Sequence, residues 1–214
     1  MPFRIRHPRE AATLLVFGAV AALAMAGSLV ANTKTSTAQD GSYTPQFTSE
    51  GELKLPTEHV WREWPFIGTP LTPNALNGGA APFPEFHIVY IDPVSWAHWK
   101  KTGEFREGTV IAKELTSVRA PDGANADGST DEVSGTGYFM GDYTGFEITI
   151  KSRTLYPDEP GNWAYYTFGH DGEPYAASAA KQPAEACNAC HEAAAEQDFV
   201  FTQFYPVLRA AKPN

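Results

Sequence analysis

The sequence predicts an α+β fold, mainly an antiparallel β-sheet with flanking helices, in a single domain that carries one helix near its C-terminus. Short runs rich in β-branched and aromatic residues recur through the middle of the chain, and turn-forming segments separate them. The segment after Pro183 is instead rich in Ala and Glu, which favour a helix. Of the 214 residues, 43% are hydrophobic and 13% aromatic, enough for one domain with its own core.

Residues 1–26 are predicted to be a signal peptide. A positively charged stretch precedes an apolar run from Ala11 to Ala26, and Ala24-Met25-Ala26 offers a cleavage site before Gly27. A retained membrane anchor is the alternative, because the apolar run just reaches spanning length if it continues to Ala31. We favour cleavage near Ala26.

Residues 27–46 are mostly small and polar without periodicity, which predicts a flexible tether. The domain is then expected to span residues 47–214. Its first elements are a short strand or turn at Leu53, a helix that starts after Pro56 with Thr57 as its candidate cap, and a loop from Gly68 to Pro84.

The middle of the domain is predicted to be mostly strands. The expected elements, in order, are a strand over Phe86–Ile91, a helix from Asp92-Pro93 to Gly103, a strand over Gly108–Val118, a long exposed loop over Ala120–Gly135, antiparallel strands Tyr138–Met140 and Phe146–Lys151 joined through Gly141–Gly145, and a strand over Asn162–Phe168. After the C-terminal helix, apolar residues between Phe199 and Leu208 are expected to pack on the core.

Two charged residues fall within these strands. Alternation places Lys113 on one face with Ile111 and Leu115, and it places Glu147 on the face opposite Phe146. The pattern alone favours a lysine whose amine reaches water and a glutamate that faces solvent, because charged residues are rarely buried unless they are paired or functional.

The segment Cys187-Asn188-Ala189-Cys190-His191 has the attachment pattern of a c-type haem. The two thiols add across the vinyl groups and the imidazole binds the iron. On a helix, positions i, i+3 and i+4 share a face, so Cys187, Cys190 and His191 can reach one porphyrin. A disulfide and a thioredoxin-like redox pair are the alternatives, but neither requires the histidine. The sequence therefore predicts one covalent haem c per chain, with His191 as the iron ligand.

The net charge of the chain bears on its binding partners, and the predicted signal peptide bears on the compartment in which it works. The formal net charge is -9 and no basic cluster is present, which argues against a nucleic-acid partner. Covalent attachment of haem by this motif occurs outside the cytoplasm in bacteria, so the motif and the signal peptide both predict a periplasmic protein.

The second axial position of the iron can be considered from the residues alone. An electron carrier fills it with Met or His. After cleavage the candidates are Met140 and the histidines outside the motif, namely His59, His87, His98 and His170. A single methionine in a strand is more often a core residue. The sequence therefore favours an open sixth site without excluding a protein ligand.

Seven segments, taken in order, resemble the cytochrome P-460 family of bacterial hydroxylamine-oxidising haem proteins. They are Tyr90–Pro93, Trp99–Val110, Lys113–Leu115, Gly137–Tyr143, Glu159–Ala164, Cys187–His191 and Phe204–Arg209. The resemblance runs from about Gly51 to the C-terminus. It implies a periplasmic homodimer built on an antiparallel sheet, whose haem is bonded to a strand lysine as well as to the two cysteines.

The resemblance also implies roles for three residues. Lys113 would be the lysine bonded to the porphyrin, and Glu147 falls where the family places a distal carboxylate that relays protons. His87 lies where a basic distal side chain, often arginine in relatives, is expected, although a satisfied strand histidine explains it equally well. The implied reaction oxidises hydroxylamine to nitrous oxide or a more oxidised nitrogen species. Electrons would pass to a soluble periplasmic acceptor such as a small cytochrome c.

Two other functions stay open at this point. A gas-binding protein similar to cytochrome c′-beta has this fold and haem motif, but it lacks the lysine link and its distal pocket is apolar. Lys113 and Glu147 weigh against that alternative. A simple electron carrier would need a sixth protein ligand on the iron.

Overall fold

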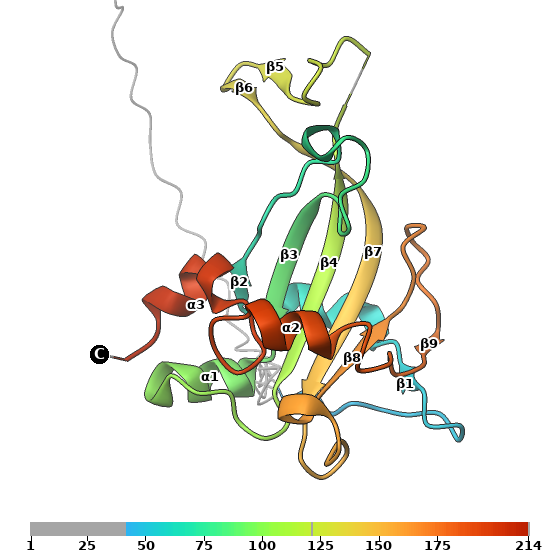
Figure 1. Cartoon of the computed structure of the whole chain (residues 1–214), viewed down its shortest axis with the longest axis vertical. Helices are drawn as coiled ribbons and strands as arrows, with labels where there is room; N and C mark the ends of the chain where they lie inside the picture. The colour runs from blue at the N-terminus through green and yellow to red at the C-terminus, as the bar shows by residue number, and fades with distance from the viewer. Residues whose placement is uncertain (1–41, 121, 214) are drawn as a thin grey trace, which may run out of the picture. The chain divides into compact units, whose positions relative to one another are not determined.

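A five-stranded antiparallel sheet forms the centre of the computed structural model, with the strand order β2-β3-β4-β7-β8 (Figure 1). The model describes residues 42–120 and 122–213, which fall within one compact unit. The strands of the sheet are β2 (Phe66–Gly68), β3 (Phe86–Ile91), β4 (Val110–Val118), β7 (Met140–Lys151) and β8 (Trp163–Thr167). The predicted α+β fold is confirmed. The predicted signal peptide and most of the predicted tether lie outside the described residues.

Short elements surround the sheet. Two small antiparallel pairs are β1 (Leu53–Lys54) with β9 (Ser178–Ala179), and β5 (Thr130–Glu132) with β6 (Gly135–Gly137). The α-helices are α1 (Pro93–Thr102), α2 (Asn188–Ala194) and α3 (Pro206–Ala210), and the 3-10 helices are η1 (Thr57–Glu63), η2 (Ala75–Asn77), η3 (Pro160–Asn162) and η4 (Thr202–Phe204). None of the described helices is long and apolar enough to cross a bilayer.

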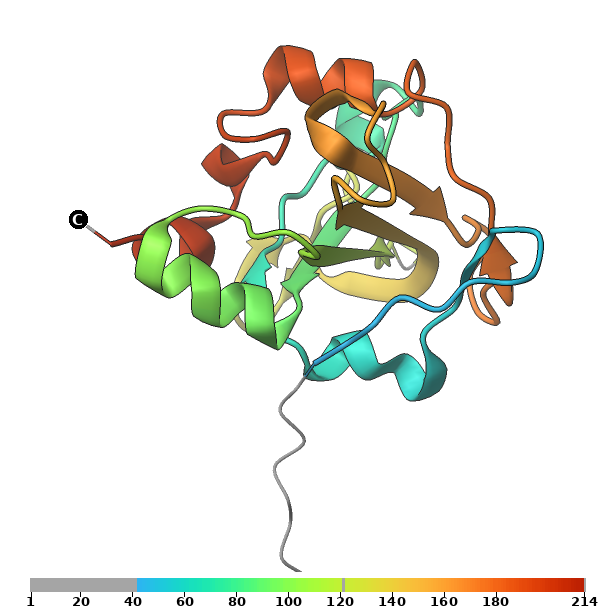
Figure 2. The same cartoon turned by 90° about the horizontal axis from the view of Figure 1, so that it is seen from below.

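The two faces of the sheet bury different sets of side chains, as strand alternation requires. We call the face that bears Val89, Lys113 and Glu147 the α2 face, because α2 lies over it while η1 lies on the opposite side (Figures 1 and 2). The core on the α2 face consists of Ile67, Val89, Ile91, Trp99, Phe105, Ile111, Trp163, Tyr165, Val200, Tyr205 and Leu208. The opposite core includes Leu53, Trp61, Trp64, Val110, Ala112, Phe146, Ile148, Ile150 and Tyr166.

The segment from β3 through α1 confirms the prediction. Asp92 caps α1 because its Oδ1 accepts a hydrogen bond from the Ser95 amide at 2.9 Å, and its Oδ2 accepts one from the Val110 amide, also at 2.9 Å. Pro93 occupies the first turn, and Gly103 ends the helix with a φ of 69°. The indole of Trp99 donates to the Leu208 carbonyl at 2.8 Å, which ties α1 to α3.

The predicted hairpin over residues 138–151 is wrong, because β7 continues as one strand from Met140 to Lys151 and pairs with β4. Its glycines serve close packing instead of a turn. A Cβ on Gly141 would lie 2.4 Å from Ser117 Oγ, and a Cβ on Gly145 would lie 2.7 Å from His170 Cδ2. The loop expected over residues 120–135 also contains strand structure, since β5 and the start of β6 fall within it.

The helix predicted after Pro56 is a 3-10 segment and not an α-helix. Glu58 and His59 have positive φ angles of 54° and 51°, which interrupt any α-helical hydrogen bonding. The residues just before the predicted domain start have no regular structure, but Tyr43 packs on Trp64 with a ring-centroid distance of 5.2 Å. Burial raises the pKa of Tyr43 to about 12.

Candidate haem site

The predicted haem-attachment segment lies on the α2 face, and Asn188 holds it there. The Asn188 side chain is buried, and its Nδ2 donates to the Trp163 carbonyl of β8 at 2.8 Å. The helix begins at Asn188, later than the predicted start after Pro183, and Cys187 takes the cap position. This difference reflects a tertiary contact, because the side chain within the motif bonds to a strand far away in sequence.

The two cysteines of the motif are not joined in a disulfide. Cys187 is half-buried against the core of the α2 face, and Cys190 is exposed. Burial raises the pKa of the Cys187 thiol. The amide of His191 donates to the Cys187 carbonyl at 3.2 Å, so one helical turn brings the three motif residues together. The arrangement fits two thioether bonds to one porphyrin.

The His191 ring is oriented as a metal-binding imidazole. Its Nδ1 donates to the Phe199 carbonyl at 2.7 Å, which leaves the lone pair of Nε2 for a metal ion. The ring packs against Tyr165 and Phe201, with centroid distances of 4.6 and 4.7 Å. Burial lowers the pKa of His191 and so favours the neutral, ligating form.

Lys113 and Glu147 form an ion pair on the α2 face. They lie directly opposite each other on β4 and β7, and Lys113 Nζ is 2.6 Å from Glu147 Oε2. Their side chains are only 22% and 18% exposed, so the interpretation of Glu147 as a solvent-facing residue is wrong. Lys113 Nζ also lies 4.4 Å from the centre of the Phe83 ring, a cation–π contact.

His170 is a second partner of Glu147, beside Lys113. Its Nε2 donates to Glu147 Oε1 at 3.0 Å. Burial raises the pKa of Glu147, but Lys113 and His170 outweigh that effect and bring it to about 2. The sequence singled out His170 only as a candidate axial ligand. Its position three residues after Thr167, which pairs with Glu147, becomes informative only once the strand register is known.

His87 lies on the same face but bonds to the loop before β3. Its Nε2 donates to the Phe83 carbonyl at 2.6 Å and lies 3.3 Å from Thr72 Oγ1. Burial is the main cause that lowers the pKa of His87, and the positive charge of Lys113 adds to it. In this geometry a neutral His87 anchors the loop that carries Phe83 over Lys113.

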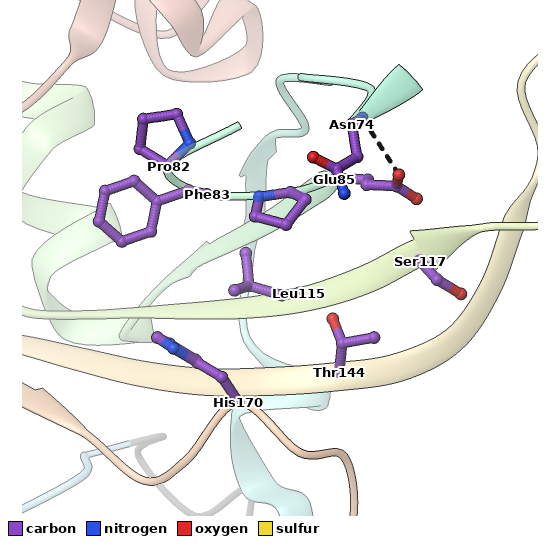
Figure 3. A pocket seen from close by; sticks show the side chains of 9 residues that line it. Asn74, Pro82, Phe83, Glu85, Leu115, Ser117, Thr144 and His170 are labelled. Atoms are coloured by element: carbon purple, nitrogen blue, oxygen red, sulfur yellow. Dashed lines mark hydrogen bonds between the residues drawn. The ribbon is translucent and has the colours of Figure 1, made fainter. Parts of the chain in front are cut away.

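A pocket of about 320 Å³ includes His170, the hydrogen-bond partner of Glu147, in its wall (Figure 3). Its wall consists of Asn74, Pro82, Phe83, Pro84, Glu85, Leu115, Ser117, Thr144 and His170. His170 and Phe83, which contact Glu147 and Lys113 respectively, thus both face the pocket. A small polar molecule in this pocket would meet the His170 imidazole directly, and the ion pair of Lys113 and Glu147 contacts the wall through Phe83 and His170.

The motif on α2 and the ion pair on the sheet face the same region. The charges on Lys113 and Glu147 act on the pKa of both Cys187 and His191, as only nearby groups do. Two free thiols, an imidazole with an available Nε2 and a strand lysine therefore fit a covalently attached haem. Among residues 42–120 and 122–213, no group of three or more His, Cys, Asp or Glu side chains offers another metal site.

Met140 is not a core residue, contrary to the prediction. Its side chain is 45% exposed at the start of β7, and it precedes Glu147 by seven positions, which is about 23 Å along a strand. His59 pairs with Glu173 at 3.0 Å, away from the α2 face. Met140 and His59 therefore both lie apart from the ion pair of Lys113 and Glu147.

Comparison with known proteins agrees with this site. A family model described as Cytochrome P460 matches residues 58–202, which include Lys113, Glu147 and the whole Cys187–His191 motif. Among the curated proteins, none is similar enough to match the chain. Because the family match covers more than half of the sequence, the chain belongs to the Cytochrome P460 family, and this membership implies a c-type haem cofactor and haem-dependent redox chemistry.

Proposed function

We propose that the protein is a periplasmic enzyme that oxidises hydroxylamine. The observation that carries the proposal is the ion pair of Lys113 and Glu147, 2.6 Å apart, on the sheet face that the haem-attachment helix covers. A charged pair that contacts the wall of a pocket through His170 and Phe83 suits proton-coupled chemistry, whereas a pocket that only binds a diatomic gas needs no such groups. This supports turnover over gas binding without turnover.

The residues that would hold the cofactor are Cys187 and Cys190, through thioether bonds, and His191, through Nε2. When bound, the haem supplies an iron that takes up electrons from hydroxylamine and passes them on. Two hydroxylamine molecules give one nitrous oxide, one water, four protons and four electrons. The electrons leave to a soluble one-electron carrier such as a small cytochrome c, and the protons need an acceptor in the pocket.

Glu147 is the proposed proton acceptor, and Lys113 controls its basicity. With a pKa of about 2, set in part by the Lys113 ammonium, Glu147 is a weak base at neutral pH. A covalent bond from Lys113 to the porphyrin would replace that ammonium with a weakly basic amine and raise the pKa of Glu147. Forming the bond removes one hydrogen from Nζ and one from a ring carbon, a two-electron oxidation for which a peroxide is a suitable oxidant.

Three further features belong to the same proposal. The predicted signal peptide over residues 1–26 supports a periplasmic location. The four electrons released per nitrous oxide support a soluble one-electron carrier as the partner. The family resemblance supports a homodimer. Cell fractionation and light scattering of the purified protein would test the location and the oligomeric state.

The function is tested on full-length protein produced in a host that attaches c-type haem. We expect hydroxylamine-dependent reduction of an artificial electron acceptor dye, with nitrous oxide or a more oxidised nitrogen product measured in parallel. Glu147→Gln should lower the rate by roughly 100-fold, as expected for loss of a general base. Glu63→Gln, which changes an exposed carboxylate, is the matched control. Haem-loaded wild-type protein that binds nitric oxide but shows no hydroxylamine-dependent reduction would overturn the proposal.

A further inference from the structure

His170 connects a mostly buried carboxylate to solvent. Its Nε2 donates to Glu147 Oε1 at 3.0 Å, and its side chain is 48% exposed, compared with 18% for Glu147. The ring lies on the wall of the pocket (Figure 3). Of the two groups that contact the Glu147 carboxylate directly, Lys113 is the more buried one, and His170 is the one that reaches water.

The backbone around His170 holds the ring in this position. The Phe146 amide donates to the Gly169 carbonyl at 3.2 Å, and the Gly172 amide donates to the Thr144 carbonyl at 3.1 Å, so both sides of the loop are tied to β7. Gly145 lies under the ring, since a Cβ there would come within 2.7 Å of His170 Cδ2. The fold therefore leaves space for this imidazole beside Glu147.

The charges around His170 make it suited to exchanging protons. The hydrogen bond to Glu147 raises its pKa, its burial opposes that effect, Lys113 lowers the pKa and the neighbouring Asp171 raises it. The net shift is upward from the ordinary value of about 6.5. An imidazole in this range both accepts and releases protons near neutral pH.

We propose that His170 is a positioning residue that transfers protons between Glu147 and solvent. The inference rests on the proposed function and deepens it. Each proton that Glu147 takes from the substrate passes to Nε2 of the neutral ring, which carries its hydrogen on Nδ1, and the resulting imidazolium donates from Nε2 to Glu147. Nδ1 then releases one proton to water, and exchange between the two neutral tautomers through water frees Nε2 for the next proton. The four protons formed per nitrous oxide thus leave through the pair of Glu147 and His170, while the four electrons leave through the iron to the carrier.

The first test measures turnover in variants of the haem-loaded, full-length protein. His170→Gln keeps a hydrogen-bond donor for Glu147 but cannot titrate. We expect it to lower kcat by about ten-fold or more, with little change in KM, and we expect added imidazole to restore most of the loss. The pH–rate profile should also lose its limb near neutral pH. His98→Gln is the control, because His98 lies on α1 and its side chain makes no hydrogen bond or ion pair among the described residues.

The second test does not depend on turnover. Diethyl pyrocarbonate reacts with a histidine ring in its neutral form and not in its protonated form. The rate at which His170 is modified, measured at several pH values by peptide mass spectrometry, therefore reports the protonation of the ring. We expect Glu147→Gln to move the His170 midpoint to lower pH and to leave the profile of His98 unchanged.

The two tests separate failure of the inference from failure of the proposed function. Active wild-type protein with an equally active His170→Gln variant would overturn the transfer of protons through His170. A His170 midpoint that Glu147→Gln does not move would overturn the proton coupling between the two residues, even in protein that does not oxidise hydroxylamine. Absence of turnover in the wild type bears instead on the proposed function.

Discussion

Lys113 and Glu147 face each other across β4 and β7, with Nζ 2.6 Å from Oε2, and each side chain is mostly buried. The pair links two properties of the protein. As an ion pair it stabilises the fold, and as a means of lowering the pKa of Glu147 it weakens the base that the proposed reaction needs. A covalent bond that consumes the Lys113 ammonium would remove both effects: the fold would lose the ion pair, and Glu147 would become a stronger base.

The acid dependence of stability should report this pair. The pKa of Glu147 falls from 4.5 to about 2 on folding, so its contribution is present above pH 4.5 and is lost as the pH falls towards 2. We expect that loss to be about 3 kcal/mol in protein without the lysine link, from the same shift. Urea unfolding between pH 2 and 6 measures it.

The matched variants for this measurement are Glu147→Gln and Glu63→Gln. Glu147→Gln should lack the acid-dependent component, and Glu63→Gln, at an exposed position, should keep it. Protein with the lysine link should keep only the part of the component that His170 causes. An unlinked wild type whose stability follows that of Glu147→Gln across this range would contradict the assigned pairing.

Lys113→Arg and Lys113→Met separate the charge of this residue from its bond to haem. Mass spectrometry of a protease digest of haem-loaded wild type should find a haem species that joins the Cys187–His191 peptide to the Lys113 peptide. Both variants should carry haem on the cysteine peptide alone. Arginine should keep the pKa of Glu147 low, and methionine should let it rise. A wild-type digest without the joined species would remove the link and favour gas binding.

The elements that the sequence predicted well are those whose signals are local. Asp92, Pro93 and Gly103 mark the ends of α1 through contacts within a few residues, and the observed helix has these ends. The predicted strand around Lys113 is also confirmed, because the alternation of side chains along a strand decides which face of the sheet each one takes.

The elements that the sequence missed depend on contacts between distant segments. Gly141 and Gly145 resemble turn residues, but they lie within β7, which pairs with β4, and Ser117 and His170 pack closely against them. The helix carrying the motif starts where Asn188 bonds to β8. The partnership of Glu147 with His170 arises from strand register and a returning loop, neither of which periodicity encodes.

Arg62 and Glu114 form a buried ion pair on the opposite face of the sheet. Glu114 is fully buried, and its carboxylate accepts bonds from Arg62 Nε at 3.0 Å, Arg62 Nη2 at 2.7 Å and the Tyr175 hydroxyl at 3.0 Å. Arg62→Met leaves this carboxylate without a cation, so we expect a loss of about 3–5 kcal/mol in the free energy of unfolding.

Two control variants test whether the loss of stability comes from the buried, unpaired Glu114 carboxylate. Arg119→Met breaks an exposed pair with Glu132 and should cost less than about 1 kcal/mol. The double variant Arg62→Met with Glu114→Leu should recover most of the loss, because no buried charge is left unpaired. Equal costs for Arg62→Met and Arg119→Met in urea unfolding would show that the Glu114 carboxylate is not held in the buried position described.

Gly145→Ala tests whether packing beneath His170 positions the proton path. The added Cβ would lie 2.7 Å from His170 Cδ2, 3.1 Å from the Gly169 carbonyl oxygen and 3.2 Å from Leu115 Cδ1, so the imidazole has to move away from Glu147. We expect about 1–3 kcal/mol of destabilisation from this overpacking. Hydroxylamine turnover should fall as it does in His170→Gln, and the diethyl pyrocarbonate profile of His170 should lose its dependence on Glu147.

The control for this variant is Gly137→Ala on β6, where the nearest atoms to an added Cβ are those of the Phe139 ring at 3.9 Å, an ordinary contact. Gly137→Ala should keep wild-type turnover and the wild-type His170 profile. If Gly145→Ala also keeps both, then the position of the imidazole does not depend on the space that Gly145 leaves. Restored turnover of Gly145→Ala in added imidazole would show instead that the displaced ring, and not a wider disturbance of β7, causes the loss.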